Sequence, residues 1–426
     1  MNCDWHQKEL SEIADVIDPH PSHRAPQSVT CGFSFAGIGD IDEYGNINHQ
    51  KARQISEEFV LQQENSYHIN SHTIGYGRVG TVGKVVKLRK QSYRYALSPT
   101  LAVINPKKNI DPYFLFYAIK SQKFFNKVES RMTGTTRPAI GIQLLRTITI
   151  DVPSIEIQKK IGFILSTLDG KIELNKKINQ TLESIAQAMF KSWFVDFDPV
   201  HAKANAQSED EYDAIAKELG ISREILDLFP SEFEESDLGL IPKGWIRKKI
   251  TDICKIVYGK NLPTKKLTES GYPVYGGNGI IGFYHNYSYQ MPQVLVGCRG
   301  AASGVVHISK PNSFVTNNSL VLTISDSNRV NFEYLSIYAQ QADFSIYRTG
   351  SAQPQITIQS INQHRITLPN NNLIKYWKFI LRPIQSNIEI NIRVIDYLSS
   401  IKDLLLPKLL SGEFDVSNLN LEPEND

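Results

Sequence analysis

Two stretches of the chain place mainly apolar residues at alternating steps of four and three, the spacing of a coiled-coil seam. Each stretch predicts a long amphipathic helix. The seam positions of the first are Ile161, Leu165, Leu168, Ile172, Asn175, Asn179, Leu182, Ala186 and Met189. Those of the second are Trp377, Leu381, Ile384, Ile388, Asn391, Ile395, Leu398, Lys402 and Leu405. We expect the two seams to bury against each other.

Some seam positions are not apolar. Asn175 and Asn391 are equivalent, and a buried amide at such a position costs stability but fixes the register of pairing. Gly170 lies about one turn before Asn175, and Pro383 lies about two turns before Asn391. Both residues weaken a helix, so a kink or a restart is expected at each.

The regions before the two helices have a different pattern. Short alternating runs such as VGKVVKL (82–88) and GVVHIS (304–309) predict strands joined by turns. Looser similarities pair IADVI (13–17) with TDICKIV (251–257), and GRVGTVGKV (77–85) with CRGAASGVV (298–306). The order along the chain is therefore globular region, helix, globular region, helix.

An internal repeat explains this order. TGTTRPAIGIQ (133–143) returns as TGSAQPQITIQ (349–359) with six of eleven residues identical, at an offset of 216 residues. The same offset relates KIELN (171–175) to NIEIN (387–391), so a whole unit is duplicated. We expect two globular domains, at 1–153 and 242–370. Each is followed by a long helix, at 154–197 and 371–412. An acidic helical linker at 198–241 lies between the two halves, and an acidic tail at 413–426 ends the chain. Within the linker, 211–220 and 222–229 read as short helices.

Composition indicates a globular protein with the charge of a phosphate-binding protein. The 426 residues are 41% hydrophobic and 21% charged, with no apolar run long enough to span a bilayer and no secretory signal, so a cytoplasmic protein is expected. The net charge of +2 hides eleven acids against two bases between Ser208 and Leu238, and five acids in the tail from Ser411. The rest holds 44 Lys and Arg against 28 Asp and Glu, about +16. A basic body suits nucleic acid, although surface lysines also simply solubilise proteins.

Apparent catalytic motifs fail on their context. GYGRVG (75–80) is followed by β-branched residues where a nucleotide-binding loop needs a helix. FAGIGD (35–40) resembles the cofactor loop of cytosine-C5 DNA methyltransferases, but no Pro-Cys nucleophile follows. DPYF (111–114) lacks the second proline of the DPPY motif of amino-methyltransferases. We therefore expect no chemistry and no metal or cofactor bound by this chain.

Three segments carry a resemblance to a known family. STLDGKIELNKKINQTLESIAQAMFKSWFVDFDPVHAKA (166–204) resembles the central conserved region of the specificity (S) subunits of type I restriction-modification enzymes. LGLIPKGW (238–245) resembles the entry to that family's second target-recognition domain, and LLLPKLLSGEF (404–414) its distal conserved end. IKYWKFILRP (374–383) departs from the family in lacking the usual Glu-Gln at the helix start.

The resemblance implies an α+β protein in which two mixed α/β target-recognition domains are separated by two long antiparallel coiled-coil helices with pseudo-two-fold symmetry. Each domain would read one half of a bipartite double-stranded DNA target. Two methyltransferase (M) subunits using S-adenosylmethionine would methylate adenine N6, and restriction (R) subunits using ATP and Mg would cleave. A coiled-coil scaffold, a DNA-binding adaptor without a restriction role and a solitary DNA-acting enzyme stay open as alternatives.

Candidate DNA contacts follow from side-chain chemistry. Arg can bind guanine in a bidentate manner, Gln and Asn can bind adenine, and Lys mostly meets phosphate. Gly-flanked loops allow the backbone to approach a duplex, although each such residue could equally be a solvated turn residue. The candidates are Tyr76, Arg78, Lys84 and Arg137 in the first domain, and Lys260, Lys265, Lys266, Arg299, Gln353 and Gln355 in the second.

Overall fold

The computed structural model describes residues 5–22, 24, 26–42, 44–134, 136–206, 208–236, 239–350 and 353–420. The chain divides into two compact units: unit 1 comprises Met1–Lys176 with Ile392–Asp426, and unit 2 comprises Lys177–Asn391. Both boundaries fall inside a long helix, α6 (Ile155–Phe194) or α13 (Asn371–Ser411). Each unit therefore combines one globular region with half of each long helix.

The described residues of unit 1 form three small sheets. Their strand orders are β1-β9, β2-β8-β5-β6 and β4-β3-β7, with β3 and β7 parallel and the other pairs antiparallel. The strands are β1 (His6–Glu9), β2 (Ala14–Ile17), β3 (Phe33–Ala36), β4 (Arg53–Ile55), β5 (Ile74–Gly77), β6 (Val85–Lys87), β7 (Tyr95–Leu97), β8 (Leu101–Pro106) and β9 (Thr149–Val152). The helices are α1 (Leu10–Ile13), η1 (Ile38–Asp40), α2 (Glu57–Glu64), α3 (Pro112–Lys120), α4 (Gln122–Glu129) and α5 (Ile142–Arg146).

Unit 2 repeats this plan strand for strand. Its sheets run β12-β20, β13-β19-β16-β17 and β15-β14-β18, with β14 and β18 parallel. The strands are β12 (Ile246–Lys249), β13 (Cys254–Tyr258), β14 (Tyr272–Gly276), β15 (Gly279–Tyr284), β16 (Val294–Gly297), β17 (Val306–Ile308), β18 (Phe314–Val315), β19 (Ser319–Ile324) and β20 (Arg365–Leu368). The helices are α10 (Ile250–Ile253), η2 (Thr264–Lys266), η3 (Gly300–Ala302), α11 (Phe332–Gln341), η4 (Phe344–Tyr347) and α12 (Ile358–Ile361). The α+β fold and its internal repeat are confirmed.

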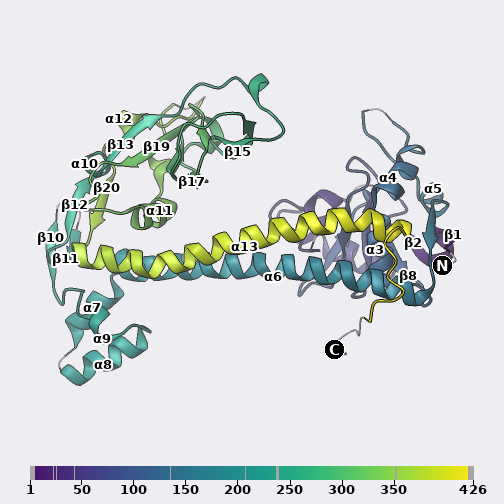
Figure 1. Cartoon of the computed structure of the whole chain (residues 1–426), viewed down its shortest axis with the longest axis horizontal. Helices are drawn as coiled ribbons and strands as arrows, with labels where there is room; N and C mark the ends of the chain where they lie inside the picture. Colours follow the sequence, from purple (N-terminus) through teal and green to yellow (C-terminus); the bar gives the residue numbers. More distant parts are fainter. Residues whose placement is uncertain are drawn as a thin grey trace. The chain divides into compact units, whose positions relative to one another are not determined.

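The two long helices lie side by side (Figure 1). In unit 1, the Lys402 ammonium of α13 meets the Asp169 carboxylate of α6 at 2.7 Å. In unit 2, the rings of Phe190 on α6 and Trp377 on α13 lie edge to face with centroids 5.4 Å apart. Because α13 contacts α6 with its start in unit 2 and its end in unit 1, the helices are antiparallel.

Burial differs along the predicted seam. Leu165, Ile172 and Leu381 are at most 4% exposed. Five further seam residues are partly buried: Leu168, Leu182, Ile384, Ile388 and Leu398.

The expected restarts at Gly170 and Pro383 are wrong, because both helices continue through these residues. Pro383 withdraws one backbone donor, but Trp377 and Leu381 on the preceding turns are fully buried. Packing of this seam therefore outweighs the local weakness.

The acidic stretch after α6 is a folded part of unit 2. It forms α7 (Asp198–Asn205), α8 (Glu209–Glu218), α9 (Arg223–Leu226) and a hairpin of β10 (Phe233–Ser236) and β11 (Gly239–Pro242). The two short helices expected there are α8 and α9. Val200 and Phe229 are buried in the same core as Trp245, and the Lys203 ammonium donates to the carbonyls of Leu226 and Phe229. This stretch is therefore more than a connecting linker.

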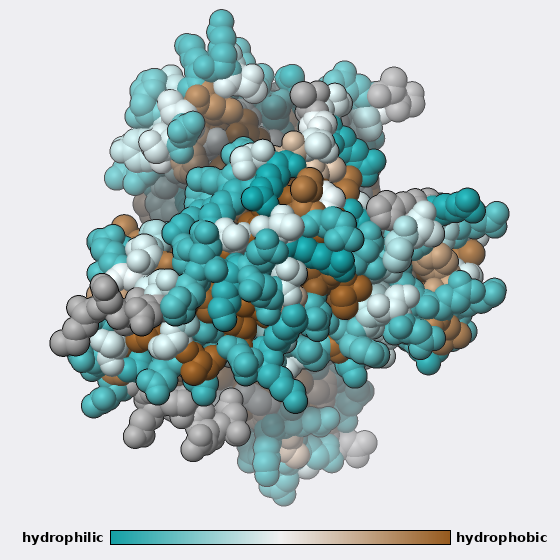
Figure 2. Space-filling model, turned by 90° about the vertical axis from the view of Figure 1, so that its right-hand side faces the viewer, coloured by the Kyte–Doolittle hydropathy of each residue, from teal (hydrophilic) through white to brown (hydrophobic). Residues whose placement is uncertain are grey.

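One face of the molecule shows polar residues over most of its area, with apolar residues in small separate areas (Figure 2). Among the described residues, none of the helices combines the length and apolarity that crossing a bilayer requires.

Candidate nucleic-acid interface

In unit 1, the repeated phrase, a glycine turn and a strand-end loop meet at one place. The backbone N–H of Arg78 donates to the Thr100 carbonyl at 2.9 Å, and the N–H of Ile140 donates to the Arg78 carbonyl at 2.9 Å. The N–H of Gly80 donates to the Pro138 carbonyl at 2.9 Å. We call residues 77–80, 98–100, 133–134 and 136–140 loop cluster 1.

Unit 2 builds the same arrangement with the same bonds. Cys298 donates to Asn318, Ile356 donates to Cys298, and Gly300 donates to Pro354, over 2.8 to 3.0 Å. Residues 297–300, 316–318, 349–350 and 353–356 are loop cluster 2. The repeated segments, 133–143 and 349–359, therefore have the same role: in each unit the ends of the segment are bridged and pack against the glycine turn.

The hydrogen bonds also fix the register between the clusters. Gly80 and Gly300 are equivalent and both adopt positive φ, +76° and +63°, which favours glycine. Arg78 is therefore equivalent to Cys298, and not to Arg299 as the sequence similarity suggested. Arg78 and Cys298 are both buried, and burial raises the pKa of the Cys298 thiol.

Three candidates in unit 1 have structural roles instead of exposed ones. Tyr76 is completely buried in the core, with its ring edge to face against Phe124, so its prediction as a DNA contact is wrong for this structure. The side chain of Arg78 is 5% exposed and forms an ion pair with Asp18 at 2.6 Å. The Lys84 ammonium donates to the carbonyls of Ile38 and Ile41 at 2.9 and 2.6 Å, which holds η1 in place.

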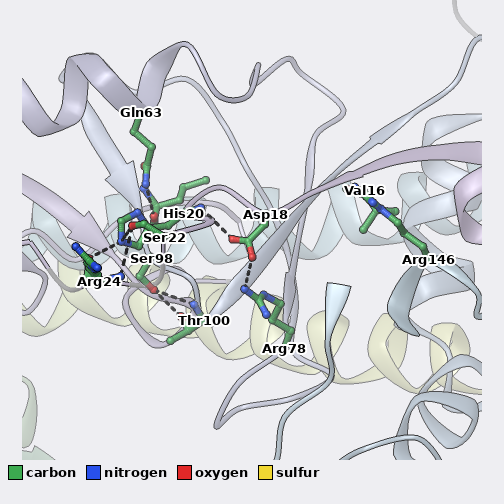
Figure 3. A network of polar contacts seen from close by, with 11 residues as sticks. Val16, Asp18, His20, Ser22, Arg24, Gln63, Arg78, Ser98, Thr100 and Arg146 are labelled. Carbon is green, nitrogen blue, oxygen red and sulfur yellow. Dashed lines mark hydrogen bonds and ion pairs between the residues drawn. The ribbon is translucent and has the colours of Figure 1, made fainter. Parts of the chain in front are cut away.

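A polar network extends the Arg78 ion pair toward the surface (Figure 3). Asp18 accepts from the backbone N–H of His20 at 3.0 Å. The buried His20 imidazole bonds to the carbonyl of the exposed Arg24 at 2.6 Å. Of the four candidates in this unit, Arg137 in the repeated phrase is exposed, and Arg24 is an exposed cation that the sequence patterns did not single out.

The candidates in unit 2 all lie on the surface. Arg299 forms a β-bridge with Gln355, which in turn bridges Thr349, so Arg299, Gln353 and Gln355 share loop cluster 2. Lys260 joins them through its backbone carbonyl, which accepts from the Asn317 N–H at 3.1 Å. Lys265 and Lys266 are exposed in η2. The structure therefore brings four candidates together at loop cluster 2: Lys260, Arg299, Gln353 and Gln355. The other two, Lys265 and Lys266, lie on a separate segment.

Two amides were missed. Asn318 is exposed in loop cluster 2, and Asn278 is exposed in the turn between β14 and β15. The Gly-Gly-Asn-Gly run at 276–279 is a hairpin signal that could have drawn attention to Asn278. The charge of the surrounding segment is positive, because residues 255–325 contain six Lys and Arg and one carboxylate, that of Glu269. This part of unit 2 has the composition of a polyanion-binding surface.

The long helices also carry a second apolar face that points outward. In unit 1, Val394, Tyr397, Ile401 and Leu404 of α13 are exposed, Tyr397 by 73%. In unit 2, the residues 216 positions earlier, Ile178, Thr181, Ile185 and Ala188 of α6, are exposed as well. The last three of these border a hollow of about 540 Å³ along α6. Their alternating steps of three and four residues are the spacing of a coiled-coil seam.

The motifs that resembled catalytic loops have structural explanations. GYGRVG runs from β5 into a turn and then into β6, so no helix N-terminus follows it. Asp111 of DPYF is the N-cap of α3, where its carboxylate accepts the Phe114 N–H at 2.8 Å. Burial raises the pKa of this carboxyl. Within the described part of the chain, no three His, Cys, Asp or Glu side chains gather to hold a metal.

Comparison with known proteins gives a consistent result. The sequence model of the family described as "Type I restriction modification DNA specificity domain" matches residues 2–184 and 242–396. The specificity subunit of the type I restriction enzyme HindI of Haemophilus influenzae is 30% identical, over 96% of this chain and 99% of that protein. The MjaIX specificity subunit of Methanocaldococcus jannaschii is 26% identical over 74% and 72%. The crystal structure of an S subunit from M. genitalium shares the fold, with a TM-score of 0.57 and 16% identity over 96% of both chains.

Proposed function

The chain belongs to the DNA-specificity (S) subunits of type I restriction-modification systems, and from this premise we propose that each unit reads one half of a bipartite duplex target. An S subunit is a non-catalytic component of its enzyme. Here the two globular regions, 1–153 and 242–370, act as the target-recognition domains.

The observation that carries the proposal is the matched construction of the two loop clusters. The same backbone hydrogen bonds hold both, while the side chains they display differ: Arg137 at the first, and Arg299, Gln353 and Gln355 at the second. A common frame with different displayed side chains is what two readers of different sequences require. Arg and Gln can discriminate guanine and adenine in the major groove.

Lysines supply affinity without sequence preference. Lys260, Lys265 and Lys266 are exposed in a region with one carboxylate, so they attract phosphate from any sequence. A coiled-coil scaffold without DNA contact would not need this excess of cations over carboxylates beside exposed amides. The charge distribution therefore favours DNA recognition over the scaffold alternative.

We assign catalysis to partner subunits. Two M subunits would bind S-adenosylmethionine and methylate adenine N6, and R subunits would use ATP and Mg to cleave. The outward apolar faces of α13 in unit 1 and α6 in unit 2 support two partners, because they occupy equivalent positions of the repeat. Each face would receive a helix of one M subunit.

Gel shifts with mixed duplexes test DNA binding by the chain together with its M subunits. Lys265→Ala and Lys266→Ala should weaken all sequences alike and reduce the salt slope by about one unit each. A complex that binds no duplex contradicts the proposal. The isolated chain incubated with S-adenosylmethionine should give no methylation, and methylation by the chain alone would contradict its role as a specificity subunit.

The partner faces are tested by native mass spectrometry with the M subunit. Tyr397→Ala and Ile185→Ala should each weaken one of two binding steps, because each removes apolar area from one face. Phe379→Ala, also strongly exposed on α13 but outside both faces, is the matched control. Unchanged binding in both variants would overturn the assignment of these faces.

A further inference from the structure

The hairpin of β14 and β15 in unit 2 carries apolar side chains on its exposed surface. Ile280 is 47% exposed, Ile281 is 44% exposed and Phe283 is 37% exposed. Successive residues of a strand normally point to opposite faces, and one face is usually buried. Two adjacent exposed isoleucines depart from this rule.

A β-bulge explains the departure. The register pairs Val274 with Gly282 but Tyr275 with Ile280, so Ile281 is the extra residue on β15. Bulges re-aim side chains and occur beside functional sites. The bulge at Ile281 leaves both isoleucines on the surface next to the turn that displays Asn278.

The turn of this hairpin touches loop cluster 2. A Cβ atom added to Gly277 would lie 3.1 Å from the Asn318 carbonyl oxygen, and one added to Gly297 would lie 2.5 Å from the Gly277 carbonyl oxygen. The approach at Gly297 excludes any larger residue, and the one at Gly277 leaves little space for a side chain. They place Asn278 and the two isoleucines beside the loops that carry Arg299 and Asn318.

Cations border the hairpin along its free edge too. Thr268 bridges Phe283 with backbone hydrogen bonds of 2.9 and 3.3 Å, so the segment after η2 runs beside β15. Lys265 and Lys266 are exposed two to three residues before Thr268. The hairpin tip therefore presents apolar and amide side chains, and the adjacent segments present cations. This combination suits a nucleic acid, which has negatively charged phosphates outside and methyl groups and hydrogen-bonding base edges in its grooves.

We propose that the β14–β15 hairpin enters the major groove of one half-site and reads at least one A·T pair. The major groove admits a two-stranded β-ribbon and is where the thymine C5-methyl is displayed. Ile280 and Ile281 contact that methyl group, and the Asn278 amide binds adenine N6 and N7. Lys265 and Lys266 hold the phosphates beside the groove. This assignment rests on the proposed DNA-reading function and adds the base pair and the groove.

The described residues of unit 1 form no equivalent of this ribbon tip. Its corresponding strands, β3 and β4, are joined by a long connection that includes η1, instead of the tight turn at 277–278. The thymine contact is therefore confined to the half-site read by unit 2.

The test uses the complete chain with its M subunits and the target found by methylome sequencing. Each thymine is replaced in turn by deoxyuridine, which removes the C5-methyl and nothing else. Binding should weaken about three- to fivefold per contacted methyl, at positions in one half-site only. The double variant Ile280→Ala, Ile281→Ala should bind thymine and deoxyuridine duplexes equally, whereas the control Ile346→Ala, an exposed isoleucine outside the hairpin, should discriminate like the wild type.

The outcomes separate the two levels of the argument. Tight duplex binding without a deoxyuridine effect, or with an effect that survives in the double variant, overturns the hairpin assignment and leaves DNA recognition standing. Absence of duplex binding by the wild-type complex overturns the proposed function itself. Asn278→Ala provides an independent reading, because it should relax the preference for adenine at one position about tenfold.

Discussion

The side-chain amide of Asn391 donates a hydrogen bond to the side-chain oxygen of Asn179 across the helix seam at 2.8 Å. The Asn179 amide in turn donates to the Ile388 carbonyl at 3.4 Å. This polar pair lies on an otherwise largely apolar seam of unit 2. The repeat made Asn175 the counterpart of Asn391, but the Asn175 amide donates to the Lys171 carbonyl of its own helix.

Asn391→Leu should destabilise unit 2 by about 1 to 3 kcal/mol, because Asn179 is 8% exposed and would lose its side-chain partner. The double variant Asn179→Leu, Asn391→Leu should regain that stability, since two leucines fill the seam without a buried polar group. Thermal unfolding followed by tryptophan fluorescence measures both. A double variant less stable than the single one would contradict this account.

Asn175→Leu is the matched control for this pair. Its amide bonds within α6 at a partly exposed position, so the change should alter stability by less than about 1 kcal/mol. An effect as large as that of Asn391→Leu would show that the hydrogen bond across the seam is not the decisive feature.

Asp169→Asn should cost about 2 to 3 kcal/mol at neutral pH, because it removes the ion pair with Lys402 across the seam of unit 1. Burial raises the pKa of Asp169, but hydrogen bonds from Lys402 and Tyr117 outweigh burial and hold it below its ordinary value. A carboxyl whose folded pKa is depressed stabilises the fold above its unfolded pKa and loses this contribution as pH falls through the folded pKa.

The stability difference between wild type and Asp169→Asn should therefore be constant above about pH 5 and shrink below about pH 4. Urea unfolding at several pH values measures it. A difference that grows on acidification would have the wrong sign for this ion pair.

Tyr76→Phe should leave DNA preference unchanged and should not reduce stability. The Tyr76 hydroxyl is buried and has no hydrogen-bond partner among the described residues, so its removal relieves a desolvation cost of about 1 kcal/mol. Unfolding midpoints and a binding assay on random duplexes test the two statements. Altered base preference would restore Tyr76 as a DNA contact.

Leu381→Ala should cost about 2 to 5 kcal/mol, because this seam leucine of α13 is 1% exposed. Phe379→Ala, two residues earlier on the same helix, removes a larger side chain that is 71% exposed and should change stability by less than about 0.5 kcal/mol. Equal effects at the two positions would mean that the seam does not face the partner helix.

Periodicity predicted the helices well. The steps of four and three gave helices at 154–197 and 371–412, and the structure has Ile155–Phe194 and Asn371–Ser411. Such periodicity depends only on residues that are close in sequence, because the seam residues of one helix lie on one face of it. Gly170 and Pro383 misled because their local cost is small beside the packing of the buried residues around them.

Side-chain roles in the loops were less predictable, since they depend on residues far apart in sequence. Arg78 is an attractive DNA contact until Asp18, 60 residues earlier, is seen to hold it. Tyr76 lies in a glycine-rich run that resembles a loop, yet it is in β5 between β8 and β6, and neither glycine nor tyrosine shows which face is covered. The unit 2 candidates stayed exposed because they lie in turns beyond strand ends.

Independent reading of two half-sites is the central claim, and methylation of a library randomised in both halves tests it most directly. The chain is assembled with its M subunits and compared with Arg137→Ala and Arg299→Ala. Arg299→Ala should relax preference in one half only, by about 1 to 3 kcal/mol at one base pair, and Arg137→Ala in the other half only. Altered preference in both halves by either single substitution would contradict the account.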